Sequence, residues 1–305
     1  MSSASDAGAP KGGLRKRAEG KGERDLRRPP LPEPLPSPVY DNHTHLEIED
    51  GIEMLEPVDS LERAVGVGVA GVVQVGTDLE TSRWSAELAA ADPRVLAAVA
   101  LHPNEAPKLF AQGLLSAHLS EISRLASQPR VRAVGETGLD FFRTGEDGRE
   151  AQIESFEAHI DIAKGNGLAL QIHDRDAHDA VVSTLKRIGA PERTVFHCFS
   201  GDAELARICN DNGWYMSFSG TSTFKSAQGL REALETARPE LVLVETDAPF
   251  LTPEPFRGRP NAPYLMPNTV RRMAEHLGIE LDELCARLAA NTERVYGSWA
   301  MDDDA

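Results

Sequence analysis

A chain of 305 residues, of which 41% are hydrophobic, can build a full core, and its length suits a single α/β barrel of about 250 residues. No apolar run approaches the roughly 20 residues of a membrane span, and the amino terminus has no stretch typical of a signal peptide. We therefore expect a cytoplasmic protein that makes no contact with a membrane. The net charge of −16 disfavours sequence-independent coating of DNA, because an acidic surface repels phosphates.

The cysteine pattern agrees with a reducing compartment. Cys198, Cys209 and Cys285 are widely spaced and form no CxxC pair, which argues against a zinc ribbon or a redox site. We expect three reduced thiols.

Residues 1–38 differ in composition from the rest of the chain. They are rich in Ser, Gly, Pro and charge, and they hold eight Lys or Arg against five acidic residues. Such a segment buries too little apolar surface to offset its ordering entropy, so we predict a disordered basic extension. Its charge could help to hold a polyanion, and a solubilising role is the other interpretation. The folded domain is predicted to span residues 39–305.

From residue 39 onward, short β-rich runs alternate with longer helical patterns. Most of the runs are continuously apolar, as expected of parallel strands that are covered on both faces. Eight alternations predict the α/β class and a closed TIM (β/α)8 barrel. The rival, an open doubly wound sheet, lacks a GxGxxG motif after the first strand. The predicted strands are 39–45, 71–76, 95–101, 131–136, 168–173, 194–198, 214–219 and 241–247, and the predicted helices lie near 57–68, 79–91, 113–127, 150–166, 176–189, 202–212 and 225–237, with a final helical segment over 268–296.

Polar side chains gather at the carboxyl ends of these strands. Asp41, His43 and His45 end the first strand, and they point the same way because alternate residues of a strand share a face. One metal needs only three or four protein ligands, so six candidates suggest two divalent ions with a bridging carboxylate. Mixed nitrogen and oxygen ligands suit Zn, Mg or Mn and do not name the ion. The candidate metal ligands are His43, His45, Glu136, His173, His197 and Asp247.

These strand ends resemble the TatD family of metal-dependent hydrolases, within the wider amidohydrolase superfamily. Many amidohydrolases place a modified lysine at the fourth strand, whereas Glu136 stands there in this chain and favours the TatD-like branch. The matching segments occur in family order: Asp41–Leu46 (DNHTHL), Leu101–Pro103 (LHP), Gly135–Phe142 (GETGLDFF), Ile172–Arg175 (IHDR), His197–Gly201 (HCFSG), Ser219–Phe224 (SGTSTF), Glu245–Pro249 (ETDAP) and Asn291–Val295 (NTERV).

The resemblance implies a TIM-barrel deoxyribonuclease, expected to act as an exonuclease on DNA ends or single strands. It also implies the metal assignment: His43, His45 and Asp247 for the first ion, His173 and His197 for the second, and Glu136 as the bridge. Two departures leave the substrate preference open. Glu47 stands where the family usually has Asp, and Thr144 stands where many members have another acid.

The expected chemistry is hydrolysis by a water that two metals activate. Asp247 is the candidate general base and Glu136 the bridging ligand. His102 could hydrogen-bond a phosphate or protonate the leaving oxygen, or it could be a structural histidine before a proline. Glu245 shares the strand face of Asp247 and is expected to orient a ligand histidine from the layer below.

Cations in the loops after the strands suit a phosphate substrate. Arg175 and Arg143 are the candidate substrate-binding residues, and Lys225 and Arg257 are weaker candidates. Few aromatic residues are available for stacking, so a short DNA end in the barrel mouth fits better than an extended single strand.

Two other functions stay open. The same metals could hydrolyse an amide, ester or lactone in a small molecule, and this amidohydrolase is the main alternative. A non-enzymatic scaffold is the other, but it would have no need to keep six metal-ligand residues. No GxSxG motif supports a mechanism that uses a serine or cysteine nucleophile. The sequence does not fix the oligomeric state, and we expect a monomer.

Overall fold

Eight parallel strands form the centre of the protein in the computed structural model, which describes residues 14–17 and 24–300. In sheet order they are β2, β4, β5, β6, β7, β8, β9 and β10, so each strand lies beside the next one along the chain. A bridge between Thr44 and Ala248 joins the first strand to the segment after the last, and Asp247 N donates to His43 O at 2.9 Å. The predicted TIM barrel is therefore confirmed. The strand bounds are β2 Val39–Thr44, β4 Val69–Val75, β5 Val95–Val99, β6 Val131–Asp140, β7 Ala169–Arg175, β8 Thr194–Phe196, β9 Tyr215–Phe218 and β10 Val242–Val244.

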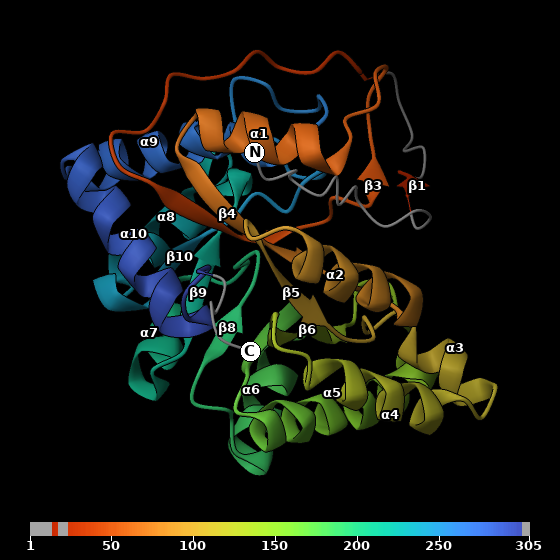
Figure 1. Cartoon of the computed structure of the whole chain (residues 1–305). Coiled ribbons are helices and arrows are strands. Elements are labelled where there is room, and N and C mark those ends of the chain that lie inside the picture. The colour runs from red at the N-terminus through yellow and green to blue at the C-terminus, as the bar shows by residue number, and fades with distance from the viewer. Residues whose placement is uncertain (1–13, 18–23, 301–305) are drawn as a thin grey trace.

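Helices cover the outside of the barrel (Figure 1). The final helical segment was predicted as one stretch over residues 268–296, but the structure has two helices there. The first of them ends at Gly278, which has a positive φ of 64°. A short helix, α3, also precedes the predicted segment 113–127. The helix bounds are α1 Pro57–Gly66, α2 Leu79–Ala91, α3 Ala106–Ala111, α4 Leu115–Ala126, α5 Glu146–Asn166, α6 His178–Ile188, α7 Ala203–Asn212, α8 Gln228–Thr236, α9 Met266–Leu277 and α10 Leu281–Tyr296, with 3-10 turns η1 Gly220–Thr223, η2 Pro239–Leu241 and η3 Pro263–Leu265.

Two sets of buried apolar side chains form the core. The larger set lies between the strands and the surrounding helices. The smaller set takes alternate residues of the strands, which point into the barrel, and Tyr296 and Trp299 pack against it. Its strand members are Val73, Val75, Leu96, Ala98, Ala133, Ala169, Val195 and Leu243. A packed interior leaves the carboxyl ends of the strands as the place where polar groups can converge.

Part of the basic extension is ordered. Arg15–Lys16 forms a strand, β1, that pairs with β3 (Ile48–Glu49). Residues 24–38 run across the top of the molecule in Figure 1, from the β1–β3 pair toward α9. The prediction of disorder is therefore wrong for residues 14–17 and 24–38. Hydrogen bonds and ion pairs with the barrel hold these residues in place, although they bury little apolar surface. The rest of the predicted extension lies outside the described residues.

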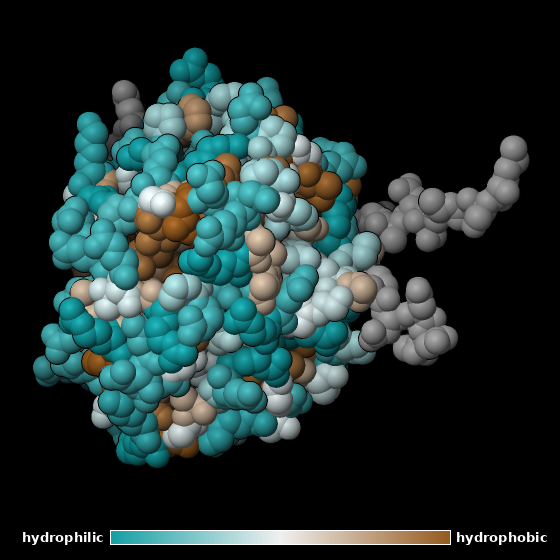
Figure 2. Space-filling model, turned by 90° about the vertical axis from the view of Figure 1, so that its left-hand side faces the viewer, coloured by the Kyte–Doolittle hydropathy of each residue, from teal (hydrophilic) through white to brown (hydrophobic). Residues whose placement is uncertain are grey.

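A surface pocket of about 410 Å³ lies between η1, α8 and α9. Figure 2 looks on to this side of the molecule and shows a hollow in which hydrophobic residues gather. Two arginines that line the pocket already have partners within the protein. Arg231 donates to Phe224 O at 2.7 Å, and Arg272 pairs with Glu275 at 2.6 Å. The groups of side chains that could hold a metal, as far as the chain is described, lie elsewhere.

Two further observations concern the whole fold. Cys198, Cys209 and Cys285 are free, as predicted. Among the described residues, no helix combines the length and apolar character that a membrane crossing requires.

Candidate metal centre

Two buried imidazoles at the end of β2 face each other. His43 Nδ1 donates to Gln171 Oε1 and His45 Nδ1 donates to Val75 O, both at 3.0 Å, and each of these oxygens can only accept. The neutral rings therefore carry their protons on Nδ1, and the lone pairs of the two Nε2 atoms meet at 3.3 Å. This contact is repulsive unless a proton or a metal ion lies between the two nitrogens.

Glu136 contacts histidines from both sides of the barrel mouth. Its Oε2 lies 2.8 Å from His197 Nε2 and 3.3 Å from His173 Nδ1, while its Oε1 lies 3.7 Å from His45 Nε2. The strand register of β6 shifts between Val134 and Thr137, which places Glu136 in an irregular turn of the strand. Only glycine fits at position 135 in this irregular segment, because a Cβ there would lie 2.4 Å from Gln171 Cβ.

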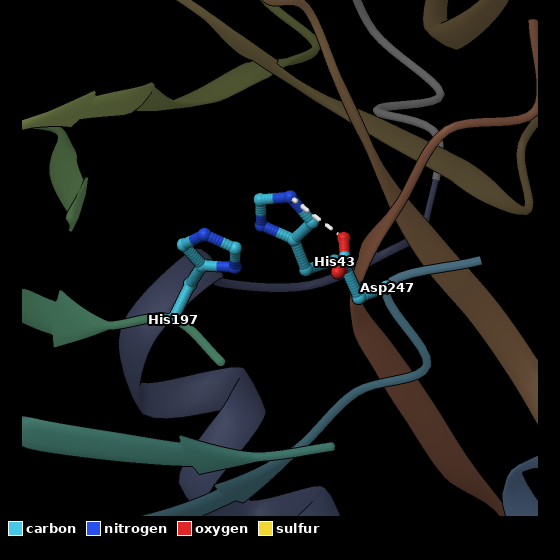
Figure 3. A group of neighbouring side chains, drawn as sticks. All are labelled: His43, His197 and Asp247. Atoms are coloured by element: carbon cyan, nitrogen blue, oxygen red, sulfur yellow. Dashed lines mark ion pairs between the residues drawn. The ribbon is translucent and has the colours of Figure 1, made fainter. Parts of the chain in front are cut away.

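Asp247 completes the group from the segment after β10. Its Oδ1 lies 3.6 Å from His45 Nε2 and 3.9 Å from His43 Nε2. Figure 3 shows Asp247 beside His43, whose ring stacks on that of His197 with a centroid distance of 3.9 Å. Asp247 has a positive φ of 51°, a conformation that Asp tolerates better than most residues, and this turn directs its carboxylate to the histidines.

The donor set fits divalent metal ions. Three groups of atoms lie close enough to share an ion: His43, His197 and Asp247; His43, His45 and Glu136; and His102, Glu136 and His173. Every one of the six predicted ligands occurs in these groups, and Glu136 and His43 each occur in two. Neutral imidazole and carboxylate are the ligands that Zn, Mn and similar ions accept.

The pKa values of the buried side chains indicate which positions attract positive charge. Burial opposes protonation of His45, but the neighbouring carboxylates, Asp247 first, raise the pKa of its imidazole to about 9. His197 is also buried, and Glu136 nevertheless raises its pKa well above the usual value. Burial opposes ionisation of Glu136 in turn, but the imidazoles of His102 and His197 hold its pKa well below the usual range. Protons thus stabilise the carboxylates where a metal would otherwise do so.

His102 lies at the edge of this group. Its Nε2 is 3.9 Å from Glu136 Oε1, and its Nδ1 accepts a hydrogen bond from Asn104 N at 3.0 Å. The neutral ring therefore carries its proton on Nε2, the atom that faces the centre. Burial lowers the pKa of His102 to about 3, so the ring is a neutral hydrogen-bond donor at physiological pH. This tautomer favours contact with a substrate oxygen over metal ligation.

A second layer of polar side chains holds the histidines. Glu245 Oε1 accepts from Cys198 N at 2.7 Å and lies 3.3 Å from His197 Nδ1, as expected for a carboxylate that orients a ligand histidine. Gln171 was missed by the sequence analysis, although it precedes His173 by two residues on β7 and so shares its face. Its Nε2 donates to Asn42 O and Tyr296 Oη, both at 2.8 Å, which fixes its carbonyl toward His43. Asp140, also missed, lies 3.4 Å from His173 Nε2.

The two predicted substrate-binding arginines lie at the rim near β6 and β7. The Arg175 guanidinium lies 4.0 Å from the ring centroid of Phe142, whose side chain is 61% exposed. Arg143 follows Phe142, is exposed, and its backbone N donates to Asp140 Oδ1. Phe142 was not singled out from the sequence, and it supplies an exposed aromatic face next to a cation.

Comparison with known proteins agrees with this geometry. The family described as TatD related DNase matches residues 40–297. The chain belongs to this TatD family. A relative from Mycobacterium tuberculosis, the uncharacterized metal-dependent hydrolase TatD, is 46% identical over 264 residues and aligns with 85% of this chain and 98% of its own length. The 3'-5' ssDNA/RNA exonuclease TatD of Escherichia fergusonii is 31% identical and aligns with 78% of this chain and 92% of its own.

Solved structures agree with the assignment to the TatD family. The crystal structure of YjjV, a TatD homolog from Escherichia coli, has a TM-score of 0.76 and 26% identity, and the match covers 85% of this chain and 98% of that one. An organophosphorus hydrolase at 13% identity, with a TM-score of 0.59, shares the barrel fold. The protein is thus a metal-dependent hydrolase of the TatD family.

Proposed function

We propose that this protein hydrolyses phosphodiester bonds of DNA, as an exonuclease on strand ends or single strands, with two divalent metals. The observation that carries the proposal is the facing pair of His43 and His45 Nε2 atoms together with Glu136, whose carboxylate reaches both sides of the centre. The name of the Escherichia fergusonii relative supports a nucleic-acid substrate.

We assign the six side chains to two ions that Glu136 would join, although His197 also lies close enough to share an ion with His43 and Asp247. His43, His45 and Asp247 would hold one ion, His173 and His197 would hold the other, and Glu136 would bridge them. When bound, two such ions lower the pKa of a shared water and polarise the phosphoryl oxygens. The mixed donor set is compatible with Zn, Mg or Mn.

The remaining steps fall to the chain's own groups. Asp247 is 14% exposed and lies beside both β2 histidines, so its carboxylate can accept the proton of the attacking water. His102 presents Nε2–H to the centre, which suits a hydrogen bond to a phosphoryl oxygen or to the leaving oxygen. Glu245 holds His197 in place from below.

The rim suits a nucleotide. Phe142 offers an exposed face on which a base can stack, and Arg175 and Arg143 supply positive charge for phosphates. A small uncharged amide substrate would have no use for these groups.

The test uses metal-free protein and labelled single- and double-stranded DNA, with Mg²⁺, Mn²⁺ or Zn²⁺ restored in separate reactions. Glu136→Gln should abolish cleavage, because it removes the carboxylate that would join the two ions. Asp161→Asn is the matched control, since this acid is 71% exposed on α5, outside the described metal-capable groups, and should cleave as the parent does.

Metal-restored cleavage that Glu136→Gln lacks would support the proposal. If the parent protein binds metal by elemental analysis but cuts neither DNA with any of the ions, the nuclease function is wrong. Assays of amides, esters and lactones would then test the small-molecule amidohydrolase.

A further inference from the structure

Residues 24–36 form a strap that joins two loops at the barrel mouth. On one side, Ile52 N donates to Leu26 O at 3.1 Å, and Arg28 Nη2 donates to Asp50 O at 2.7 Å. On the other side, the strap's carbonyls accept from the segment after β10: Arg259 Nε donates to Arg27 O at 2.9 Å and Tyr264 Oη to Pro29 O at 2.8 Å. These two loops follow the strands that supply His43, His45 and Asp247. The strap therefore borders the metal centre.

Ion pairs anchor the extension to acidic residues of this rim. The Asp50 side chain is 5% exposed and accepts from Arg17 at 2.9 Å and Arg24 at 2.7 Å. Glu47 is fully buried behind His45 and pairs with Arg15 at 3.1 Å. Buried carboxylates require such partners, and the arginines also cancel negative charge that would repel a phosphate chain.

Arg17 lies beside Phe250, an aromatic residue of the rim. Its guanidinium lies 4.7 Å from the ring centroid of Phe250, and that ring lies 6.2 Å from the ring of His45. Both side-chain hydrogen bonds that Arg17 makes within the described chain, to Asp50 and to Pro249 O, come from Nη1. Its side chain is 26% exposed, so Nε and Nη2 remain for an outside acceptor. A planar guanidinium held on an aromatic ring is well suited to a phosphate.

This part of the rim is an addition to the family's barrel. The family match begins at residue 40, and the Mycobacterium tuberculosis relative is aligned over 98% of its length while 85% of this chain is covered. We propose that Arg17 is a substrate-binding residue supplied by the extension, which contacts a backbone phosphate of a nucleic-acid strand whose end lies in the metal centre. The inference rests on the proposed nuclease function for the identity of the strand.

The experiment measures binding rather than cleavage. Full-length protein carrying Glu136→Gln is titrated into a fluorescently labelled single-stranded oligodeoxynucleotide, and anisotropy gives Kd over a range of salt concentrations. Adding Arg17→Ala should raise Kd about tenfold, as loss of a charge-assisted hydrogen bond does. The slope of log K against log salt should fall by about 0.7, the value for one phosphate contact on a single strand.

Two further variants separate contact from structure. Arg27→Ala is the matched control, because Arg27 lies in the same strap, is 76% exposed and pairs with Asp25; its Kd should stay within about twofold of the parent. Arg17→Lys keeps the charge and the pair with Asp50, so it should retain the parent's salt slope while losing part of the affinity. Thermal unfolding of each variant verifies that the barrel is intact.

An unchanged Kd and slope in Arg17→Ala would overturn the inference, and so would an equal loss in Arg27→Ala or an absence of binding by the parent. The proposed function fails separately. Arg17-dependent binding of an oligonucleotide that the wild-type protein never cuts would refute the nuclease function and leave the Arg17 site standing. Cleavage of DNA by a protein whose binding does not depend on Arg17 would refute the Arg17 site and leave the nuclease function standing.

Discussion

His159 on α5 is a fully buried histidine whose two nitrogens are both used. Its Nδ1–H donates to Ser155 O at 2.6 Å, and its Nε2 accepts from Leu101 N at 3.1 Å. Protonation of Nε2 would set two N–H groups against each other in the core. Burial accordingly lowers the pKa of His159 from 6.5 to about 4.

The consequence is a pH-dependent stability with a defined sign. The unfolded chain binds a proton near pH 6.5, while the folded chain resists it until about pH 4, so acidification through this window favours unfolding. A shift of this size gives a loss of about 2 kcal/mol at pH 5 and about 3 kcal/mol near pH 4, at 1.36 kcal/mol per pKa unit. His159→Gln removes the titrating group. The difference in unfolding free energy between wild type and variant should therefore shrink by about 2 kcal/mol from neutral pH to pH 5.

Urea unfolding of metal-free protein, followed by tryptophan fluorescence in the presence of a chelator, measures this difference without a contribution from metal release. His118→Gln is the control, since it removes a partly exposed histidine from the neighbouring helix α4. If wild type, His159→Gln and His118→Gln all lose the same free energy of unfolding on acidification, the reasoning is refuted.

Four further substitutions test the local arguments. Gln171→Leu removes the acceptor that holds the His43 ring, so metal affinity should fall about 10- to 100-fold in a chelator competition, and an unchanged affinity would contradict this role. Gly135→Ala places a Cβ 2.4 Å from Gln171 Cβ and should lower the free energy of unfolding by about 1–3 kcal/mol. Gly165→Ala meets no neighbouring atom within 4 Å and should stabilise α5 by about 0.5 kcal/mol. Calorimetry measures both changes, and equal effects of the two substitutions would refute the packing argument. Asp202→Ala removes the cap that accepts from two backbone N–H groups of α7 and should cost about 1 kcal/mol in the same assay, so an unaltered midpoint would count against it.

The barrel could be predicted because its signal is local. Continuous apolar runs mark strands that are buried on both faces, and all eight occur where the sequence placed them, within a few residues. The prediction of α9 and α10 as one helical segment shows the limit of this approach. A helical pattern continues across Gly278, but the left-handed backbone at that residue ends α9, and α10 begins only after the extended Glu280.

The candidate site was partly predictable for a related reason. Alternation along β2 places His43 and His45 on one face, and parallel strands bring their carboxyl ends together. Gln171 could not be distinguished from an ordinary polar residue, because its importance depends on an oxygen meeting His43 from another strand. The ordered extension was mispredicted because its partners, Asp50 and the segment near Arg259, are distant in sequence.

The closure of the barrel has a consequence for when this protein can become active. The backbone of Asp247, after the last strand, bonds to His43 on the first, and both residues belong to the same candidate metal group. During synthesis, the amino-terminal ligands leave the ribosome long before the carboxyl-terminal one exists. A partly made chain therefore holds an incomplete set of ligands. Hydrolysis that needs both His43 and Asp247 would therefore begin only after the barrel has closed.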